Sequence, residues 1–122
     1  MQDFRKLDVW TKSHDLALDV HRTLGKQKRI DSGAKSQLNR AAQSIPANIA
    51  EGCGRSSAAE LARYADQAIG SSTELEYHLL LNHDLGFLPK SDFDRLSSNT
   101  VQVRRMLFGL RKAVKSRAAA NN

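Results

Sequence analysis

The chain has 122 residues, with 19 basic and 13 acidic side chains that give a formal net charge of +6 at pH 7, and this length predicts one domain over residues 1–122. Only two prolines and seven glycines interrupt the sequence, which favours an all-α protein over a β fold. One cysteine excludes an internal disulfide framework, no apolar run approaches the roughly 20 residues that span a bilayer, and no signal peptide is recognisable, so we expect a cytoplasmic protein with no membrane partner.

The first predicted element is an amphipathic helix that ends near Gly25. Its apolar and aromatic positions follow each other at steps of three and four, as on one face of a helix. This face consists of Leu7, Trp10, His14, Ala17, His21 and Leu24. We expect it to face the core.

The second predicted helix covers residues 32–52 and contains Pro46. Its apolar face consists of Leu38, Ala42, Ile45, Ile49 and Gly52. Proline has no N–H to donate, and its ring crowds the carbonyl of Ala42, so the helix should kink there or restart with Ser44 as its cap. Because the apolar face keeps its phase across the proline, we predict one kinked helix.

Two further helices follow, one after a turn marked by Gly54 and one after Pro89, and Ser56 or Ser57 is the candidate cap of the third. The third helix presents Leu61, Ala65, Ala68, Ser72, Leu75, Leu79, Asn82 and Leu85. The fourth presents Phe93, Leu96, Thr100, Val103, Leu107, Leu110 and Val114, and residues 118–122 are expected to fray. Each spacing is near the 3.5 residues of bundle seams, which predicts an antiparallel up-down-up-down four-helix bundle with a proline-kinked second helix.

Several apolar residues fall outside these four faces. They are Val9, Leu16, Val20, Tyr64, Ile69, Tyr77, Leu80, Met106 and Phe108. Their recurrence on the first, third and fourth helices indicates a second buried surface, which in so small a chain means a partner subunit. The sequence therefore predicts self-association.

Basic residues concentrate in two clusters. Residues 26–40 carry a net charge of +4 and residues 95–122 carry +7 with no acidic residue, whereas residues 41–94 carry −5. The first cluster consists of Lys26, Lys28, Arg29, Lys35 and Arg40, and the second of Arg104, Arg105, Arg111, Lys112, Lys115 and Arg117. Such clusters favour binding to nucleic acid, because each neutralised phosphate releases counterions. A solvated face with favourable charge at a helix C-terminus is the other interpretation.

Known recognition motifs are absent from the sequence. It has no zinc-ligand spacing, no helical pair that reads DNA and no aromatic-rich sheet that stacks bases. Any binding is therefore expected to follow shape and backbone charge more than base sequence.

No constellation of residues predicts catalysis, a metal or another cofactor. A di-iron bundle needs Glu-x-x-His on two helices, which this chain lacks. Glu74 and His78 could hold one corner of a metal site, but the fourth predicted helix has no histidine. His14 and His21 lie two turns apart, so we expect them in the bundle or an interface. Cys53 has no histidine at catalytic spacing and is expected to be a packed thiol in a protein that is not an enzyme.

One segment carries a resemblance to a known family. Ser44-Ile45-Pro46-Ala47-Asn48-Ile49-Ala50-Glu51-Gly52, followed by Gly54-Arg55, resembles the signature of a small bacterial four-helix-bundle family encoded in intervening sequences of 23S rRNA genes and labelled ribosomal proteins for that reason. Leu7-Asp8-Val9-Trp10, the run from Gln37 to Ala42, Ala68-Ile69-Gly70-Ser71 and Glu74-Leu75-Glu76 resemble other parts of it. The segment 25–35 departs from the family, because it lacks the usual aromatic-proline pair.

The resemblance implies a ring-shaped homopentamer that binds structured RNA without catalysis, with RNA preferred over DNA. The accessory proteins of diversity-generating retroelements are related to this family and resemble proteins that bind RNA and reverse transcriptase. We do not predict reverse transcriptase as a partner of this chain. The alternative is a structural or protein-protein interaction module with no role in nucleic-acid binding.

The polar and small residues shared with the family are interpreted as a structural motif. These are Ser44, Pro46, Asn48, Glu51, Gly52, Arg55, Gly70, Ser71 and Glu74. Asn48, Glu51, Arg55 and Glu74 are expected to point inward and to form a hydrogen-bonded network that fixes the docking of the kinked helix, with Gly70 and Ser71 in the small surface that lets it come close. On this interpretation, Glu51→Ala impairs folding or assembly.

Overall fold

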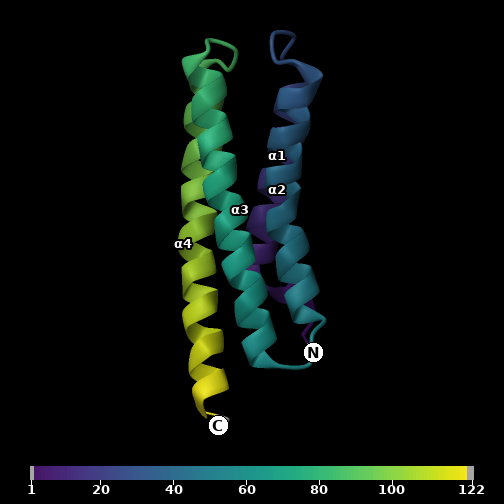
Figure 1. Ribbon diagram of the computed structural model, residues 1–122, viewed down its shortest axis with the longest axis vertical. Coiled ribbons are helices and arrows are strands. Elements are labelled where there is room, and N and C mark those ends of the chain that lie inside the picture. Colours follow the sequence, from purple (N-terminus) through teal and green to yellow (C-terminus); the bar gives the residue numbers. More distant parts are fainter. Residues whose placement is uncertain (1, 121–122) are drawn as a thin grey trace.

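The computed structural model describes residues 2–120, which form four long helices preceded by one short turn of helix. These elements are η1 (Phe4–Lys6), α1 (Asp8–Gly25), α2 (Ser32–Cys53), α3 (Ala58–Asp84) and α4 (Lys90–Ala120). No strand occurs among the described residues. The chain is thus an all-α helical bundle, as the sequence predicts (Figure 1).

Successive helices run in opposite directions in Figure 1. The α1–α2 and α3–α4 turns lie at one end of the bundle, and the α2–α3 turn lies at the other. Each helix packs against its neighbours in the sequence, and α4 closes the arrangement against α1. Near the N-terminus, the backbone N–H of Gln2 donates to the carbonyl of Cys53 at 3.0 Å, which attaches this segment to the end of α2.

Side chains cap α2 and α3 at their N-termini. The Asp31 carboxylate accepts a hydrogen bond from the backbone N–H of Ala34 at 2.7 Å, and the Ser57 hydroxyl accepts one from Glu60 at 3.2 Å. Each cap satisfies a backbone donor that has no partner inside its helix. Of the two candidate caps for α3, Ser57 is therefore the one used.

Pro46 lies inside α2, which the structure assigns as one helix from Ser32 to Cys53. Because proline has no N–H, the carbonyl of Ala42 has no donor four residues on. Ser44 lies within the helix and does not cap a second one. The continuity of α2 agrees with the sequence, and the kink remains a prediction.

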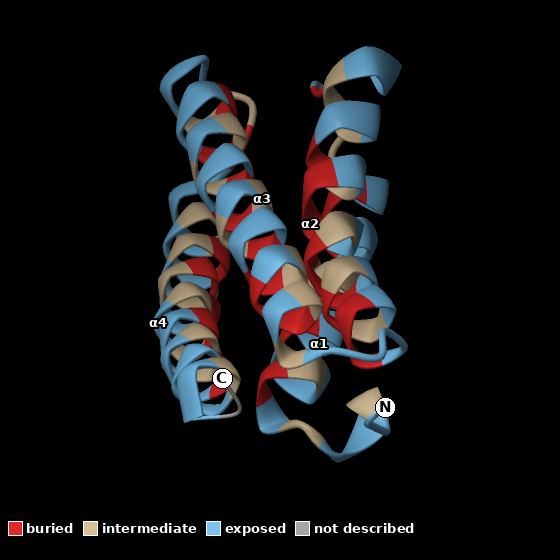
Figure 2. Cartoon of the chain, turned by 60° about the horizontal axis from the view of Figure 1, so that its bottom comes forward, coloured by how far each residue is buried: buried red, intermediate tan, exposed pale blue. Residues whose placement is uncertain are grey.

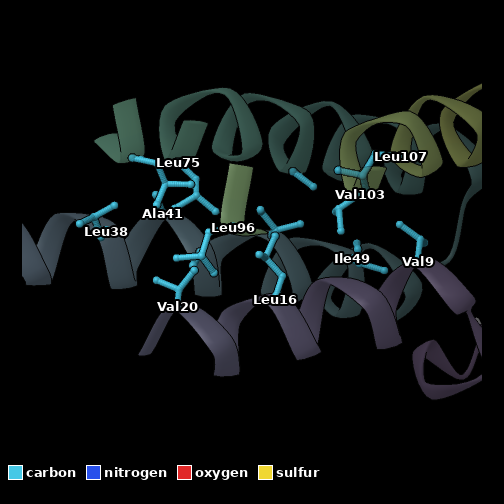
Figure 3. Packing of buried hydrophobic residues seen from close by; sticks show 14 of the residues in the cluster. Val9, Leu16, Val20, Leu38, Ala41, Ile49, Leu75, Leu96, Val103 and Leu107 are labelled. Atoms are coloured by element: carbon cyan, nitrogen blue, oxygen red, sulfur yellow. The ribbon is translucent and has the colours of Figure 1, made fainter. Parts of the chain in front are cut away.

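The predicted faces of α2, α3 and α4 point toward the bundle interior and form the core together with residues of α1 (Figures 2 and 3). Leu85 is an exception: it lies beyond the end of α3 and is exposed. The following residue, Gly86, has φ +81°, a conformation that glycine adopts without strain and that turns the chain toward α4. Leu88 is buried after this turn and attaches it to the core.

Of the predicted core face of α1, Leu24 is buried and Leu7, Trp10 and Ala17 are partly buried, but the predicted rotation of the helix is wrong. Val9, Leu16 and Val20 are buried and point into the core (Figure 3), whereas His14 and His21 are exposed. α1 carries apolar residues on two neighbouring faces, so spacing alone does not decide its rotation. Burying the aliphatic face removes more apolar surface from water and leaves both imidazoles hydrated.

Other apolar residues outside the predicted faces divide into two groups. Tyr64, Ile69 and Met106 are half-buried within the chain. The large exposed apolar side chains are Tyr77, Leu80, Leu81, Leu85 and Phe108. All five belong to α3, α4 or the turn between them, so one half of the bundle carries this apolar surface.

The C-terminal part of α4 is longer than predicted. It is helical through Ala120, so residues 118–120 belong to the helix instead of a frayed tail. Residues 121 and 122, the rest of that predicted tail, lie outside the described part of the chain. Within residues 2–120, no helix combines the length and apolar character required to cross a membrane.

Candidate nucleic-acid interface

The basic residues of α4 have two different environments. Toward α3, the Arg104 Nη1 lies 2.9 Å from Glu76 Oε1, and the Arg111 Nε lies 2.6 Å from Asp66 Oδ1. These two arginine side chains are only 21% and 35% exposed. Acidic residues of α3 therefore neutralise both charges, and their first role is to join two helices.

The other four basic residues in the C-terminal part of α4 are exposed, and we call them the α4 cation cluster: Arg105, Lys112, Lys115 and Arg117. None of them forms an ion pair with another residue in the described range 2–120. Arg105 and Lys112 are seven residues apart and so lie on one face of the helix. These charges remain available to a polyanion.

The second predicted basic cluster lies at the far end of the bundle. Lys26, Lys28 and Arg29 are exposed in the turn between α1 and α2, with the partly buried Lys35 and the exposed Arg40 following on α2. The α4 cation cluster lies toward the opposite end (Figure 1). Because a helix of 31 residues is about 46 Å long, one copy of the chain presents two separate basic patches.

Arg95, which the sequence reading did not single out, joins α4 to α1. Its Nε lies 3.0 Å from Asp19 Oδ2, its Nη1 lies 3.0 Å from Asp92 Oδ1, and its Nη2 donates to the Thr23 hydroxyl at 2.8 Å. Hydrogen bonds to Asp19 and then to Asp92 raise the pKa of Arg95. This arginine is therefore structural, although it belongs to the acid-free segment that suggested nucleic-acid binding.

The family-like polar residues form two separate groups. In the first, the Asn48 amide donates to the carbonyl and hydroxyl oxygens of Ser44 at 2.8 and 3.0 Å, and the Ser44 and Ser71 hydroxyls lie 2.8 Å apart. The Ser71 hydroxyl also donates to the carbonyl of Gln67 at 3.1 Å, so Ser44 supplies the proton shared between the two serines. This chain of hydrogen bonds links α2 to α3.

The second group lies at the surface, where α2 meets α3. Arg55 Nη2 donates to Glu51 Oε1 at 2.7 Å and to the Tyr64 hydroxyl at 2.8 Å. The hydrogen bond that Arg55 donates to the Tyr64 hydroxyl is the main reason why the pKa of Arg55 is raised. Glu51 and Arg55 thus form the pair that their spacing allows, but because the Glu51 side chain is 55% exposed, the inward position predicted for both residues is wrong.

Glu74 does not join either group. Its side chain is 56% exposed, and its Oε1 lies 3.5 Å from His78 Nε2. Glu74 lies about one helical turn after Ser71 on α3, away from the end of the helix where Glu51 and Arg55 meet. Matching a short signature cannot reveal this, because the axial position of α3 against α2 depends on packing.

The two family-like glycines also differ. At Gly52, an added Cβ would lie 2.8 Å from both Leu61 Cδ1 and Tyr64 Cβ, so the absence of a side chain allows α2 to approach α3 closely. At Gly70, no atom would lie within 4 Å of such a Cβ. Gly52 is thus a packing requirement, and the predicted contact at Gly70 is wrong.

Cys53 lies beside this close approach and is buried. Burial raises the pKa of its thiol, which keeps the group protonated and a poor nucleophile at neutral pH. No group of three potential metal-ligating side chains occurs in the part of the chain that the structure describes. The most evident chemical property of the surface is therefore its exposed positive charge.

Comparison with known proteins relates most of the bundle to one family. A family model described as 23S rRNA-intervening sequence protein matches residues 5–109. A crystal structure of a protein of unknown function from the S23 ribosomal protein family of Bacteroides thetaiotaomicron has a similar fold, with a TM-score of 0.79 and 21% identity over 85% of this chain and 98% of that one. No curated protein matches the chain.

Proposed function

Because the chain belongs to the family of 23S rRNA-intervening sequence proteins, we propose that it is a non-catalytic, homo-oligomeric helical bundle that binds structured RNA through the α4 cation cluster. Lys112, Lys115 and Arg117 lie beyond the matched residues 5–109, so the proposal about the surface rests on this chain's own residues.

The exposed positive charge at the end of α4 is the observation that carries this proposal. Four cations that no carboxylate neutralises within the described residues can each displace a counterion from a phosphate. Four such contacts give a slope of about −3 when log K is plotted against log salt concentration. Binding should therefore be strong at low salt and should tolerate differences in base sequence.

Self-association is proposed from the exposed apolar surface of α3 and α4. Tyr77 is 57% exposed, and Leu80, Leu81, Leu85 and Phe108 are also exposed. Contact between copies would remove these side chains from water and would repeat the α4 cation cluster on one assembly. The resemblance to ring-shaped relatives favours a homopentamer in the cytoplasm.

The experiment is a salt series of binding measurements with a structured RNA and a duplex DNA of matched length. It compares the native protein with Arg105→Gln/Lys112→Gln/Lys115→Gln/Arg117→Gln and with the control Arg104→Gln/Arg111→Gln. We expect the first variant to lose most binding and nearly all of the salt dependence. The control should keep both, because its two arginines pair with Asp66 and Glu76.

Two outcomes would contradict the proposal. Losses of binding free energy in proportion to the four and two charges removed would mean that net charge alone, and not the exposed cluster, determines binding. No binding at low salt by a folded, oligomeric native protein would favour the alternative, a structural or protein-protein interaction module. Its apolar surface around Tyr77 would then be the place to search for a protein partner.

A further inference from the structure

An open groove of about 430 Å³ runs between α1 and α2. Trp10 and His14 line it on α1, and Pro46, Ala47 and Ala50 line it on α2. Most of its lining is apolar, and Gln43 adds a side-chain amide. The volume is within the range of about 300–1,000 Å³ that is usual for small-molecule sites.

Aromatic rings form a stack in this groove. The Trp10 and His14 rings are parallel to within 8°, with centroids 4.8 Å apart, and Phe4 packs at an angle against Trp10 at 4.8 Å. His14 is exposed, so the stack continues toward solvent. A further planar ring placed there would gain stacking and would bury apolar surface.

The charges around the groove suit a phosphate-bearing ligand. No acidic residue belongs to its described lining. The three acidic residues of α1, Asp8, Asp15 and Asp19, are absent from it, and Asp19 is bound by Arg95. An anion that enters therefore meets no carboxylate inside the groove.

The groove also leads toward the α4 cation cluster. A second depression beside η1 shares Phe4 and Ala50 with the groove and is lined by Arg5, which pairs with Asp3 at 3.7 Å. A third depression shares Gln2 with the second and is lined by Arg117. Through these shared residues, the second depression, which Asp3 also lines, joins the aromatic groove to the depression that contains a member of the α4 cation cluster.

We propose that the groove binds one unpaired nucleobase of a structured RNA, while the adjoining nucleotides follow the depressions toward Arg117. The base stacks on the exposed His14 ring and so extends the stack that begins at Trp10, and the Gln43 amide is available to its hydrogen-bonding edge. Stacking on aromatic side chains accepts every base, in keeping with weak sequence preference. This inference rests on the proposed RNA-binding function, to which it adds the form of RNA that is preferred.

Trp10 is the only tryptophan in the chain, so its fluorescence reports on the groove directly. The test titrates the native protein with an RNA hairpin that carries a five-nucleotide single-stranded extension and with the same hairpin without it. We expect the extended hairpin to quench Trp10 and to bind more tightly. Because one stacked base changes affinity about 5- to 150-fold, a tenfold preference is a reasonable expectation.

Two substitutions in the groove and one control substitution outside it test whether the preference for the extended hairpin arises in the groove. His14→Ala removes the exposed ring, and Ala47→Leu narrows the groove from α2. Both should abolish the preference for the extension and leave the affinity for the blunt hairpin within twofold of native. Tyr77→Ala, which removes an exposed aromatic ring from α3, should keep the preference.

The outcomes separate this inference from the proposed function. Equal binding of both hairpins without quenching, while the α4 variant still loses binding, would overturn the inference and leave RNA binding intact. Absence of binding by either hairpin would overturn both. Trp10 fluorescence that changes with protein concentration alone, together with a rise in mass, would mean that a second copy occupies the groove and would overturn the inference.

Discussion

The two sides of α3 illustrate two ways of joining helices. Toward α2, the inner part of the contact is close and uncharged, with Gly52 against Leu61 and a hydrogen bond between Ser44 and Ser71, and the Arg55–Glu51 ion pair lies at its exposed end. Toward α4, partly exposed ion pairs join Glu76 to Arg104 and Asp66 to Arg111. The comparison teaches that the family-like motif builds a helix contact, whereas the basic segment of α4 divides its charges between a helix contact and solvent.

The largest expected effect is at the close contact between α2 and α3. Gly52→Ala should destabilise the protein by about 1–3 kcal/mol, because Tyr64 and Leu61 must move to admit the new Cβ. Urea unfolding gives the free energy. Gly70→Ala, in open space on α3, should instead be neutral or stabilise by up to about 1 kcal/mol. Equal effects at the two glycines would contradict the assignment of the close contact to Gly52.

A smaller loss of stability is expected when a hydrogen bond between α2 and α3 is removed. Ser44→Ala should cost about 1 kcal/mol, because it leaves the Asn48 amide and the Ser71 hydroxyl with fewer partners. A double-mutant cycle with Ser71→Ala, measured by urea unfolding, should show that the two substitutions are coupled. Strictly additive losses would mean that the two hydroxyls act independently.

Where α3 meets α4, replacing one arginine should lower the free energy of unfolding by a still smaller amount. Arg104→Gln and Arg111→Gln should each cost less than about 1 kcal/mol, since partly exposed ion pairs gain little over hydrated charges. Thermal unfolding with and without 0.5 M salt tests the cause, because added salt should reduce the difference between native protein and variants. A loss of stability that grows with salt concentration would indicate that packing of the arginine side chains, and not their charge, stabilises the contact.

The smallest effect is expected for Glu51→Ala. The sequence predicted that this change would impair folding or assembly, but the Glu51 carboxylate is exposed and contacts Arg55 at the surface. We now expect the melting temperature to fall by less than about 3 °C, with assembly unchanged by light scattering. Failure of this variant to fold would restore the original interpretation of the motif.

The sequence predicted α4 well and α1 poorly, for a physical reason. In α4, Leu96, Val103 and Leu107 lie on one face and basic residues dominate the opposite one, so periodicity leaves a single choice of rotation. In α1, two apolar faces compete, and the helix turns Val20 inward and His14 outward. Which face wins depends on contact with both neighbouring helices, and the spacing of residues along one helix does not contain that information.

The candidate site was predicted in composition but not in arrangement. Counting charges found the six basic residues in the C-terminal part of α4, yet pairing of Arg104 with Glu76 depends on the axial position of α3. The sequence does not predict the groove, because the spacing of Trp10 places this residue in the core and Pro46 is interpreted only as the cause of a kink. A helix face that carries two histidines beside its aromatic ring was the available signal that this face is exposed.

The placement of the chain ends matters for any study that attaches something to this protein. The N-terminal segment bonds to the end of α2, and the third depression brings Gln2 and Arg117 together. An affinity tag or fluorescent fusion at either terminus would therefore stand beside the basic end of the bundle, where its own charge would interfere with a test of the proposed RNA binding. The turn around Gly86 lies at the far end (Figure 1) and is the better position for a label or an inserted peptide.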